Sequence, residues 1–137
     1  MADKYGPRRL NAVNVGLLLC LLAAGYWFWR FFPAYFDGWT VDHILKETAA
    51  AVYRANRLRE PERTASLKEL IDKARADIIK KANVTDPELR VDLEIEEQMA
   101  RVMAEYSVVV THAGVSRTTT LHFKKKAEQN IKAVTWE

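Results

Sequence analysis

The chain of 137 residues is poor in cysteine, glycine and histidine, and each shortage excludes a kind of chemistry. Its single cysteine, Cys20, cannot form a disulfide within the chain. Its five glycines form no glycine-rich phosphate loop, and no serine stands in a nucleophile elbow. Its histidines, His43, His112 and His122, belong to no His/Cys/Asp/Glu cluster at metal-ligand spacing. We therefore expect no metal, no cofactor and no catalytic triad, which predicts that the protein is not an enzyme.

An excess of one charge is also missing from most of the chain. The net charge of +3 arises before residue 31, where Lys4, Arg8, Arg9 and Arg30 outnumber Asp3. From Asp37 to Glu137, seventeen basic residues face seventeen acidic ones. A neutral domain has no electrostatic field that attracts phosphates. The sequence therefore predicts no nucleic-acid partner, and it predicts that Lys124 to Lys126 is a solvated strand end.

A long apolar run is present at the start of the chain. From Leu10 to Trp29, twenty residues carry no formal charge. A helix of this length rises about 30 Å, which matches the hydrocarbon core of a bilayer. We predict three regions: a cytoplasmic flank (1–9), a transmembrane anchor with an aromatic collar (10–36) and an extracytoplasmic α+β domain (37–137).

The charges that flank the apolar run predict its orientation. Lys4, Arg8 and Arg9 precede the run, and short basic flanks stay in the cytoplasm. We therefore expect a single-pass protein of the inner (cytoplasmic) membrane, with its C-terminal domain in the periplasm or outside the cell. A cleaved signal peptide is the alternative, because Leu22 to Ala24 resembles a small-residue cleavage site. Cleavage there would leave many aromatic rings exposed on a soluble protein.

Aromatic residues crowd the end of the apolar run. Nine of the fourteen aromatic residues lie between Tyr26 and Trp39. Aromatic rings suit the headgroup layer, and Arg30 should mark the outer interface, because a charge near the bilayer midplane is costly. Pro33 predicts a kink or break in the helix. The residues expected to contact lipid or a partner are Tyr26, Trp27, Trp29, Arg30, Phe31, Phe32, Tyr35 and Trp39.

Two amphipathic helices are expected after the anchor. Thr40 is a good N-cap for a helix whose apolar residues recur from Val41 to Ala55. After a loop over Arg59 to Ala65, Ser66 and Glu69 form a capping box, which predicts a second helix that ends near Asn83.

Strands follow Pro87, where the apolar period changes from helical to two. Leu89 to Ile95 alternates apolar and charged residues, and further strands are expected over about Arg101–Thr111 and Val115–Lys124. A two-residue turn at Ala113 and Gly114 would pair Tyr106 with Leu121 and Glu105 with His122. With a weakly indicated strand near Ile131 to Trp136, the predicted fold is α+β: a transmembrane helix, then two helices packed on a three- to four-stranded antiparallel sheet.

Carboxylates on the first strand allow two interpretations. Paired carboxylates can act as acid and base, and Asp92, Glu94, Glu96 and Glu97 lie on the outer face and at the end of the strand. No apolar residue is placed to raise the pKa of any of them, so the interpretation we favour is a solvated strand face.

Two resemblances are carried by short motifs. A basic leader, Gly16, an apolar helix and a sheet resemble the plan of type IV pilins and pseudopilins, although Leu21 stands where that family has a glutamate. The order of Pro33-Ala34-Tyr35, two helices, and strands with Tyr106 and Leu121-His122-Phe123 resembles a family of small single-pass bacterial inner-membrane proteins of unknown function. The second resemblance implies an architecture and a location, and it implies no reaction.

Three functions follow from these patterns. The first is a membrane-anchored structural or accessory subunit that contacts lipid and other transmembrane subunits. The second is a pilin-like filament or secretion-system component, which predicts cleavage at Gly16. The third is a membrane-tethered domain that binds or senses a ligand between its helices and its sheet.

Overall fold

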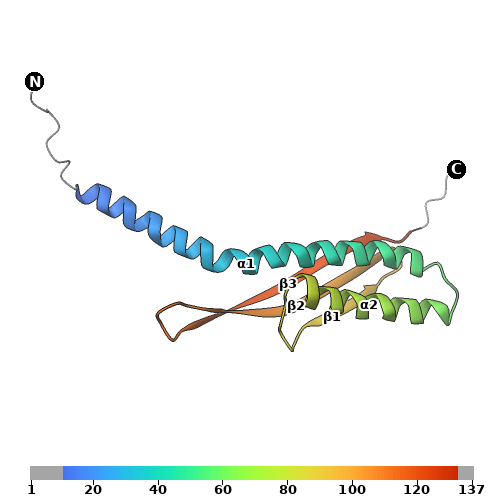
Figure 1. Cartoon of the computed structure of the whole chain (residues 1–137). Coiled ribbons are helices and arrows are strands. Elements are labelled where there is room, and N and C mark those ends of the chain that lie inside the picture. The colour runs from blue at the N-terminus through green and yellow to red at the C-terminus, as the bar shows by residue number, and fades with distance from the viewer. Residues whose placement is uncertain (1–10, 133–137) are drawn as a thin grey trace, which may run out of the picture. The chain divides into compact units, whose positions relative to one another are not determined.

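The part of the chain that the structure describes folds into two helices and one antiparallel sheet. The fold is described from a computed structural model that covers residues 11–132. Its elements are, in order, α1 (Ala12–Ala55), α2 (Glu62–Lys81), β1 (Arg90–Ile95), β2 (Met99–Thr111) and β3 (Thr118–Asn130) (Figure 1). The contacts divide the chain into Met1–Phe32 and Pro33–Glu137. We call these the apolar unit and the sheet unit, and we describe each by itself.

The predicted α+β class is confirmed, but the number of helices differs. We expected an anchor followed by two amphipathic helices, and the structure has a long apolar helix and only one more. The segment from Val41 is not a separate helix capped by Thr40, because it is the C-terminal part of α1. We expected a kink or a break at Pro33, and the break is absent, since α1 continues through this residue. An interior proline removes only one backbone donor, so the helix can continue beyond it.

α2 begins earlier than its sequence pattern suggested. We expected a loop to Ala65 and a capping box at Ser66, yet α2 starts at Glu62 after Pro61, with no side-chain cap. The N–H of Ala65 already donates to the carbonyl of Pro61 at 3.3 Å. Proline is favoured at a helix start, where its fixed φ suits the first turn and its missing N–H has no helical partner. The end at Lys81 agrees with the expected end near Asn83.

β2 is the central strand of the sheet, with β1 and β3 antiparallel on either side. β1 pairs only with the first half of β2, from Ile95↔Ala100 to Arg90↔Glu105. β2 and β3 pair along their whole lengths, so their hairpin extends past the end of β1. Within the described residues the sheet has three strands; most of the fourth strand expected near residues 131–136 lies outside them.

The register of β2 and β3 differs from the prediction by two residues. His112 donates its N–H to Arg117 at 3.0 Å, which leaves a loop of four residues in place of the expected two-residue turn. Tyr106 therefore pairs with Phe123, and Glu105 pairs with Lys124 instead of His122. Gly114 has a φ of +80°, a conformation that glycine adopts without strain. Because side chains alternate with period two, a shift of two leaves every residue on its predicted face.

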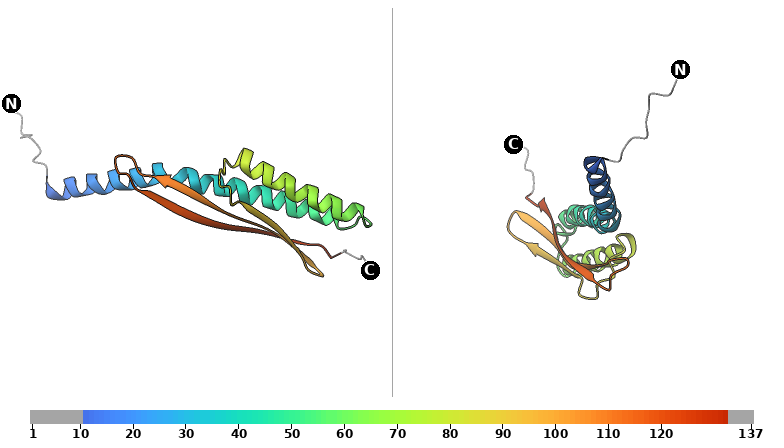
Figure 2. Two further views of the ribbon diagram at one scale, coloured as in Figure 1. Left: turned by 90° about the horizontal axis from the view of Figure 1, so that it is seen from below. Right: turned by 90° about the vertical axis from the view of Figure 1, so that its left-hand side faces the viewer.

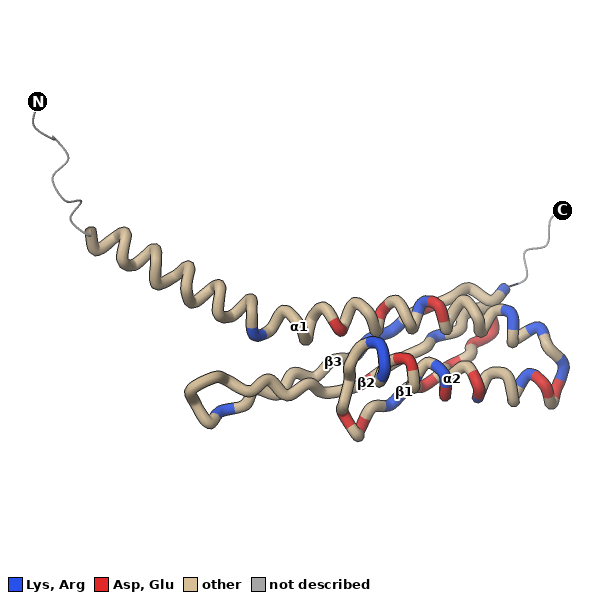
Figure 3. The backbone as a smooth tube through the Cα atoms, viewed as in Figure 1, with Lys and Arg blue, Asp and Glu red and all other residues tan. Residues whose placement is uncertain are grey.

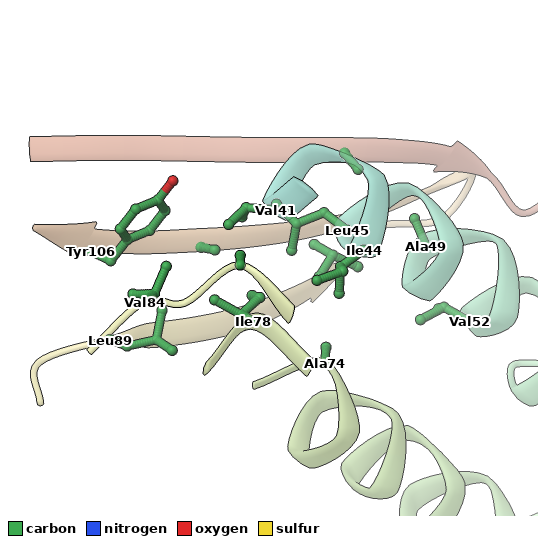
Figure 4. Packing of buried hydrophobic residues seen from close by; sticks show 14 of the residues in the cluster. Val41, Ile44, Leu45, Ala49, Val52, Ala74, Ile78, Val84, Leu89 and Tyr106 are labelled. Carbon is green, nitrogen blue, oxygen red and sulfur yellow. The ribbon is translucent and has the colours of Figure 1, made fainter. Parts of the chain in front are cut away.

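The core lies between the helices and one face of the sheet. α2 and the sheet-unit part of α1 run antiparallel over that face (Figures 1 and 2). Figure 4 shows Leu45 from α1 and Ile78 from α2 in the buried cluster, and both side chains are fully buried. The remaining large buried residues are Val41, Ile44, Val52, Val84, Leu89, Val102 and Tyr106. Every core residue follows Pro33, so the core belongs entirely to the sheet unit.

Candidate functional site

The apolar unit presents an uncovered hydrophobic helix. Its part of α1, from Ala12 to Phe32, rises about 30 Å at 1.5 Å per residue. Residues 11–29 are all exposed, including Val13 at 72% and Leu17 at 63%. Within the described residues, α1 is the one helix long and apolar enough to cross a membrane, and its apolar part is not buried in the chain. It is therefore a candidate membrane span or signal anchor.

Six of the predicted contact residues lie in the apolar unit: Tyr26, Trp27, Trp29, Arg30, Phe31 and Phe32. Trp27 and Phe31 stack with centroids 5.4 Å apart, and Phe28 contacts Phe32 at 4.7 Å. Residues four apart lie on one helix face, which explains both pairs. Phe28 was missing from the predicted set, although its spacing to Phe32 was visible in the sequence.

The other two predicted residues, Tyr35 and Trp39, lie in the sheet unit and take part in different contacts. Tyr35 meets the edge of Phe123, with centroids 5.8 Å apart, and Phe123 stacks on Tyr106 at 5.3 Å. Trp39 is 65% exposed and contacts Phe36 at 6.3 Å. Phe36 was also missing from the predicted set, although it lies three residues before Trp39. The structure therefore places Tyr35 against β3 and leaves Phe36 and Trp39 on the outer helix surface.

A polar cluster lies beneath Tyr35, where α1 crosses β2 and β3. Asp42 of α1 binds Lys125 of β3 at 2.9 Å. Gly38 borders the cluster, and a Cβ there would make ordinary contacts of 3.5 Å with the Lys125 Cε and the Tyr106 hydroxyl. This hydroxyl is buried and has no hydrogen-bond partner among the described residues. The cluster joins α1 to β3 and leaves one polar group unsatisfied.

Charge and burial act together on Tyr106. Burial first, and then the negative charges of Asp42 and Asp37, raise the pKa of Tyr106 to about 12. Burial also raises the pKa of Asp37 above its ordinary value. Both shifts favour the neutral form of the group. Protonation of the Asp37 carboxyl at low pH therefore removes one negative charge from this end of the sheet unit.

The outer face of the sheet holds a polar depression of about 370 Å³ where β1 begins. The Asp86 carboxylate accepts the N–H of Ser107 at 2.5 Å and the N–H of Glu88 at 2.9 Å. These hydrogen bonds hold the pKa of Asp86 below its ordinary value. The Ser107 hydroxyl lies 2.9 Å from Nδ1 of His122. Because serine lies between the carboxylate and histidine, the order differs from the one that activates a serine nucleophile.

Glu105 and Lys124 border the same depression and form an ion pair at 2.6 Å. The pair lowers the pKa of Glu105 and raises the pKa of Lys124. We expected His122 as the partner of Glu105, and the register shift explains why Lys124 replaces it. Sequence reasoning missed Asp86 as a member of this group. No local signal pointed to it, since Ser107 lies 21 residues further along the chain.

The histidines stay apart in the part of the chain that the structure describes. His43 pairs with Glu47 at 3.1 Å on the surface of α1, and Nε2 of His112 lies 2.8 Å from the Thr119 hydroxyl. Within residues 11–132 no three His, Cys, Asp or Glu residues are grouped so that they could hold a metal ion.

Comparisons with protein-family models, with curated proteins and with solved structures give no match. The candidate functional surfaces are therefore defined by geometry alone: the uncovered apolar helix and the exposed pair of Phe36 and Trp39.

Proposed function

We propose that the protein is a single-pass membrane-anchored accessory subunit that acts by binding other proteins and catalyses no reaction. The observation that supports the proposal best is the exposure of the apolar part of α1. Val13, Leu17 and Trp29 are all at least 63% exposed. In water, such a helix would present an apolar patch far larger than the few hundred Å² that soluble monomers usually tolerate. A bilayer removes the free-energy cost of exposing this apolar surface to water.

The continuity of α1 supports an accessory role. α1 begins in the apolar unit, and its last turns supply Leu45 and Val52 to the core of the sheet unit. No loop separates the proposed span from the folded domain. The span to which a partner would bind is therefore continuous, through a single helix, with the sheet unit.

Two surfaces suit a protein partner. Along the exposed helix, small residues recur at every fourth position: Ala12, Gly16, Cys20 and Ala24. Small residues on one face let transmembrane helices approach closely. On the sheet unit, Phe36 and Trp39 form an exposed aromatic pair, and aromatic side chains dominate interface energetics. We propose the helix face for transmembrane subunits and the aromatic pair for an extracytoplasmic contact.

Native membranes provide the test. The full chain is extracted in a mild detergent, crosslinked and weighed by native mass spectrometry. We expect a complex larger than the monomer. Replacing Phe36 and Trp39 by serine should reduce the amount of bound partner at least threefold, since about 1 kcal/mol per aromatic contact corresponds to about fivefold in affinity. The matched control replaces Lys46 and Ala50, which are exposed on the same helix. A clean monomer without crosslinked partners would contradict the proposal.

Orientation is tested separately. We propose a cytoplasmic N-terminus, because Lys4, Arg8 and Arg9 precede the span. In a Cys20→Ser background, we place a cysteine at the exposed position Glu97. It should react with a membrane-impermeant maleimide in cells whose outer membrane has been permeabilised and whose inner membrane is intact. Labelling only after cell lysis would place the sheet unit in the cytoplasm and reverse the topology.

A further inference from the structure

The β2–β3 hairpin ends in an arm that no other strand covers. β1 stops pairing at Arg90↔Glu105, whereas β2 continues to Thr111. We define the hairpin arm as residues Ser107 to Leu121. In this stretch of fifteen residues, Arg117 is the only one that carries a formal charge at neutral pH. Figure 3 shows the arm as a tan tube with a single blue segment near its turn.

Charge stops where the arm begins. On the outer face of the covered sheet, Arg101 binds Glu96 at 2.7 Å and Glu128 at 3.2 Å. The pair Glu105–Lys124 follows, and beyond it the opposed outer residues are Ser107↔His122, Val109↔Thr120 and Thr111↔Thr118. The outer face of the sheet where β1 pairs with β2 therefore carries ion-paired residues, which favour contact with water. The arm carries valine, threonine and serine in their place. Val109 is 61% exposed and Val115 is 54% exposed.

The arm points toward the end of the sheet unit at which α1 enters. Tyr35 contacts Phe123, which is opposite Tyr106, so these residues lie at one level. From Tyr106 the arm runs about 17 Å to Thr111, at about 3.4 Å per residue. From Tyr35 the helix needs only about 3 Å to reach Pro33, at 1.5 Å per residue. Within the sheet unit, the arm therefore extends more than about 10 Å beyond Pro33.

The edge of β2 that β1 leaves free is poorly suited to an added protein strand. The first free donor on that edge, the N–H of Ser107, is taken by the Asp86 carboxylate at 2.5 Å. A charged side chain at this position blocks strand addition from the β1 side, as in other protected sheet edges. On this edge only the backbone groups near Val109 and Thr111 remain, which is shorter than an ordinary strand of five to six residues, so lipid fits this side of the arm better than a strand does.

We infer that the hairpin arm docks on the membrane surface, with Val109 and Val115 in the lipid interface. The inference rests on the proposed membrane span, because that span places the bilayer at the Pro33 end of the sheet unit. Few charges, exposed valines and this direction all suit a lipid surface. The sheet unit would then contact the membrane at the arm as well as through α1, which restricts how it can tilt.

A fluorescence experiment on the full chain tests the inference. In the Cys20→Ser background, Val115→Cys carries an environment-sensitive NBD label, and the protein is reconstituted into phosphatidylcholine vesicles with or without nitroxide-labelled lipid. We expect a blue-shifted emission that nitroxide lipid quenches at least twofold. The matched control is Glu97→Cys, in the exposed turn between β1 and β2, which should show neither effect.

Tryptophan fluorescence of the unlabelled protein separates the two hypotheses. One outcome is that nitroxide lipid quenches tryptophan while the NBD signal at position 115 equals the signal at position 97. This outcome would overturn the docking of the arm and leave the proposed membrane span standing. If nitroxide lipid does not quench tryptophan at all, the proposed function itself is overturned. A blue shift at 115 without quenching would show a protein occupant, which also overturns the inference. Val109→Glu should weaken quenching at 115 at least twofold, while Ala50→Glu, on the exposed surface of α1, should not.

Discussion

At the scale of single residues, Tyr106 combines apolar packing with an unsatisfied polar group. Its ring stacks on Phe123, and its hydroxyl is buried without a hydrogen-bond partner among the described residues. A buried donor that has no acceptor costs about 1–3 kcal/mol relative to its hydrated state. The alternation of β2 predicted the face of Tyr106, but nothing in the sequence indicated that its hydroxyl would lack a partner.

We predict that Tyr106→Phe raises the free energy of unfolding by about 1 kcal/mol, because it removes the unsatisfied hydroxyl and keeps the ring. The change is measured by urea unfolding near neutral pH. The control is Tyr35→Phe, whose side chain is 47% exposed and which should change stability by less than about 0.5 kcal/mol. A destabilised Tyr106→Phe would mean that the hydroxyl is hydrogen-bonded after all.

Alkaline pH gives Tyr106 a second signature. Its pKa rises from 10.0 to about 12 on folding, so above pH 10 the unfolded chain ionises first. The stability contribution is therefore fully present below pH 10 and is lost as the pH rises toward 12. Tyr106→Phe should flatten this loss in unfolding curves measured between these two values. Identical curves for both proteins would contradict the pKa shift.

Asp86 gives the opposite dependence on pH. Hydrogen bonds from the backbone of Glu88 and Ser107 lower its pKa below 3.8, so its contribution is present above that value and is lost in acid. Wild type should lose more stability than Asp86→Asn between about pH 5 and about pH 2. Asp92→Asn, on the exposed face of β1, serves as the control and should follow wild type.

At the scale of elements, the faces of the strands could be read from the sequence, but their register could not. Alternation assigned Val102, Ala104 and Tyr106 to one face, and all three are buried. The register depends on the loop, which has four residues where two were expected. Similarly, the helical period of Val41 to Ala55 was predicted, while the continuity of α1 through Pro33 and the start of α2 at Glu62 were not.

Cysteine pairs test the register directly. With Cys20 replaced by serine, Ser107→Cys and His122→Cys should form a disulfide on mild oxidation. These residues are directly opposite each other on the outer face, within reach of a disulfide. Glu105→Cys with His122→Cys, which the two-residue turn would have paired, should crosslink far more slowly. Both rates of disulfide formation are measured by thiol titration. Faster crosslinking of the second pair would contradict the observed register.

At the scale of the whole molecule, α1 serves two environments. Most of its apolar residues before Pro33 are exposed, whereas Val41, Leu45 and Val52, further along the helix, form part of the core. The same residue type therefore has different roles in the two units. Leu17 is 63% exposed, whereas Leu45 is fully buried.

We predict different effects on the free energy of unfolding for alanine at these two leucines. Leu45→Ala should lower the free energy of unfolding of the sheet unit by about 2–5 kcal/mol, because it leaves a cavity in the core. Leu17→Ala should leave that free energy unchanged within about 0.5 kcal/mol, and it should weaken membrane insertion slightly. The two free energies of unfolding are measured in detergent by chemical unfolding, which is followed by circular dichroism. A large loss for Leu17→Ala would mean that the span contributes to the core.

The sequence by itself determined the apolar run from Leu10 to Trp29, the α+β class and the buried face of each strand. These features follow from local composition and from periods of two and 3.6 residues, which need no knowledge of distant parts of the chain. Tertiary structure alone decided the pairing of Tyr106 with Phe123, the partner of Asp86 and the uncovered hairpin arm. An even shift of register preserves the pattern of faces, so alternation cannot choose among registers. Loop closure and contacts between residues far apart in the chain make that choice.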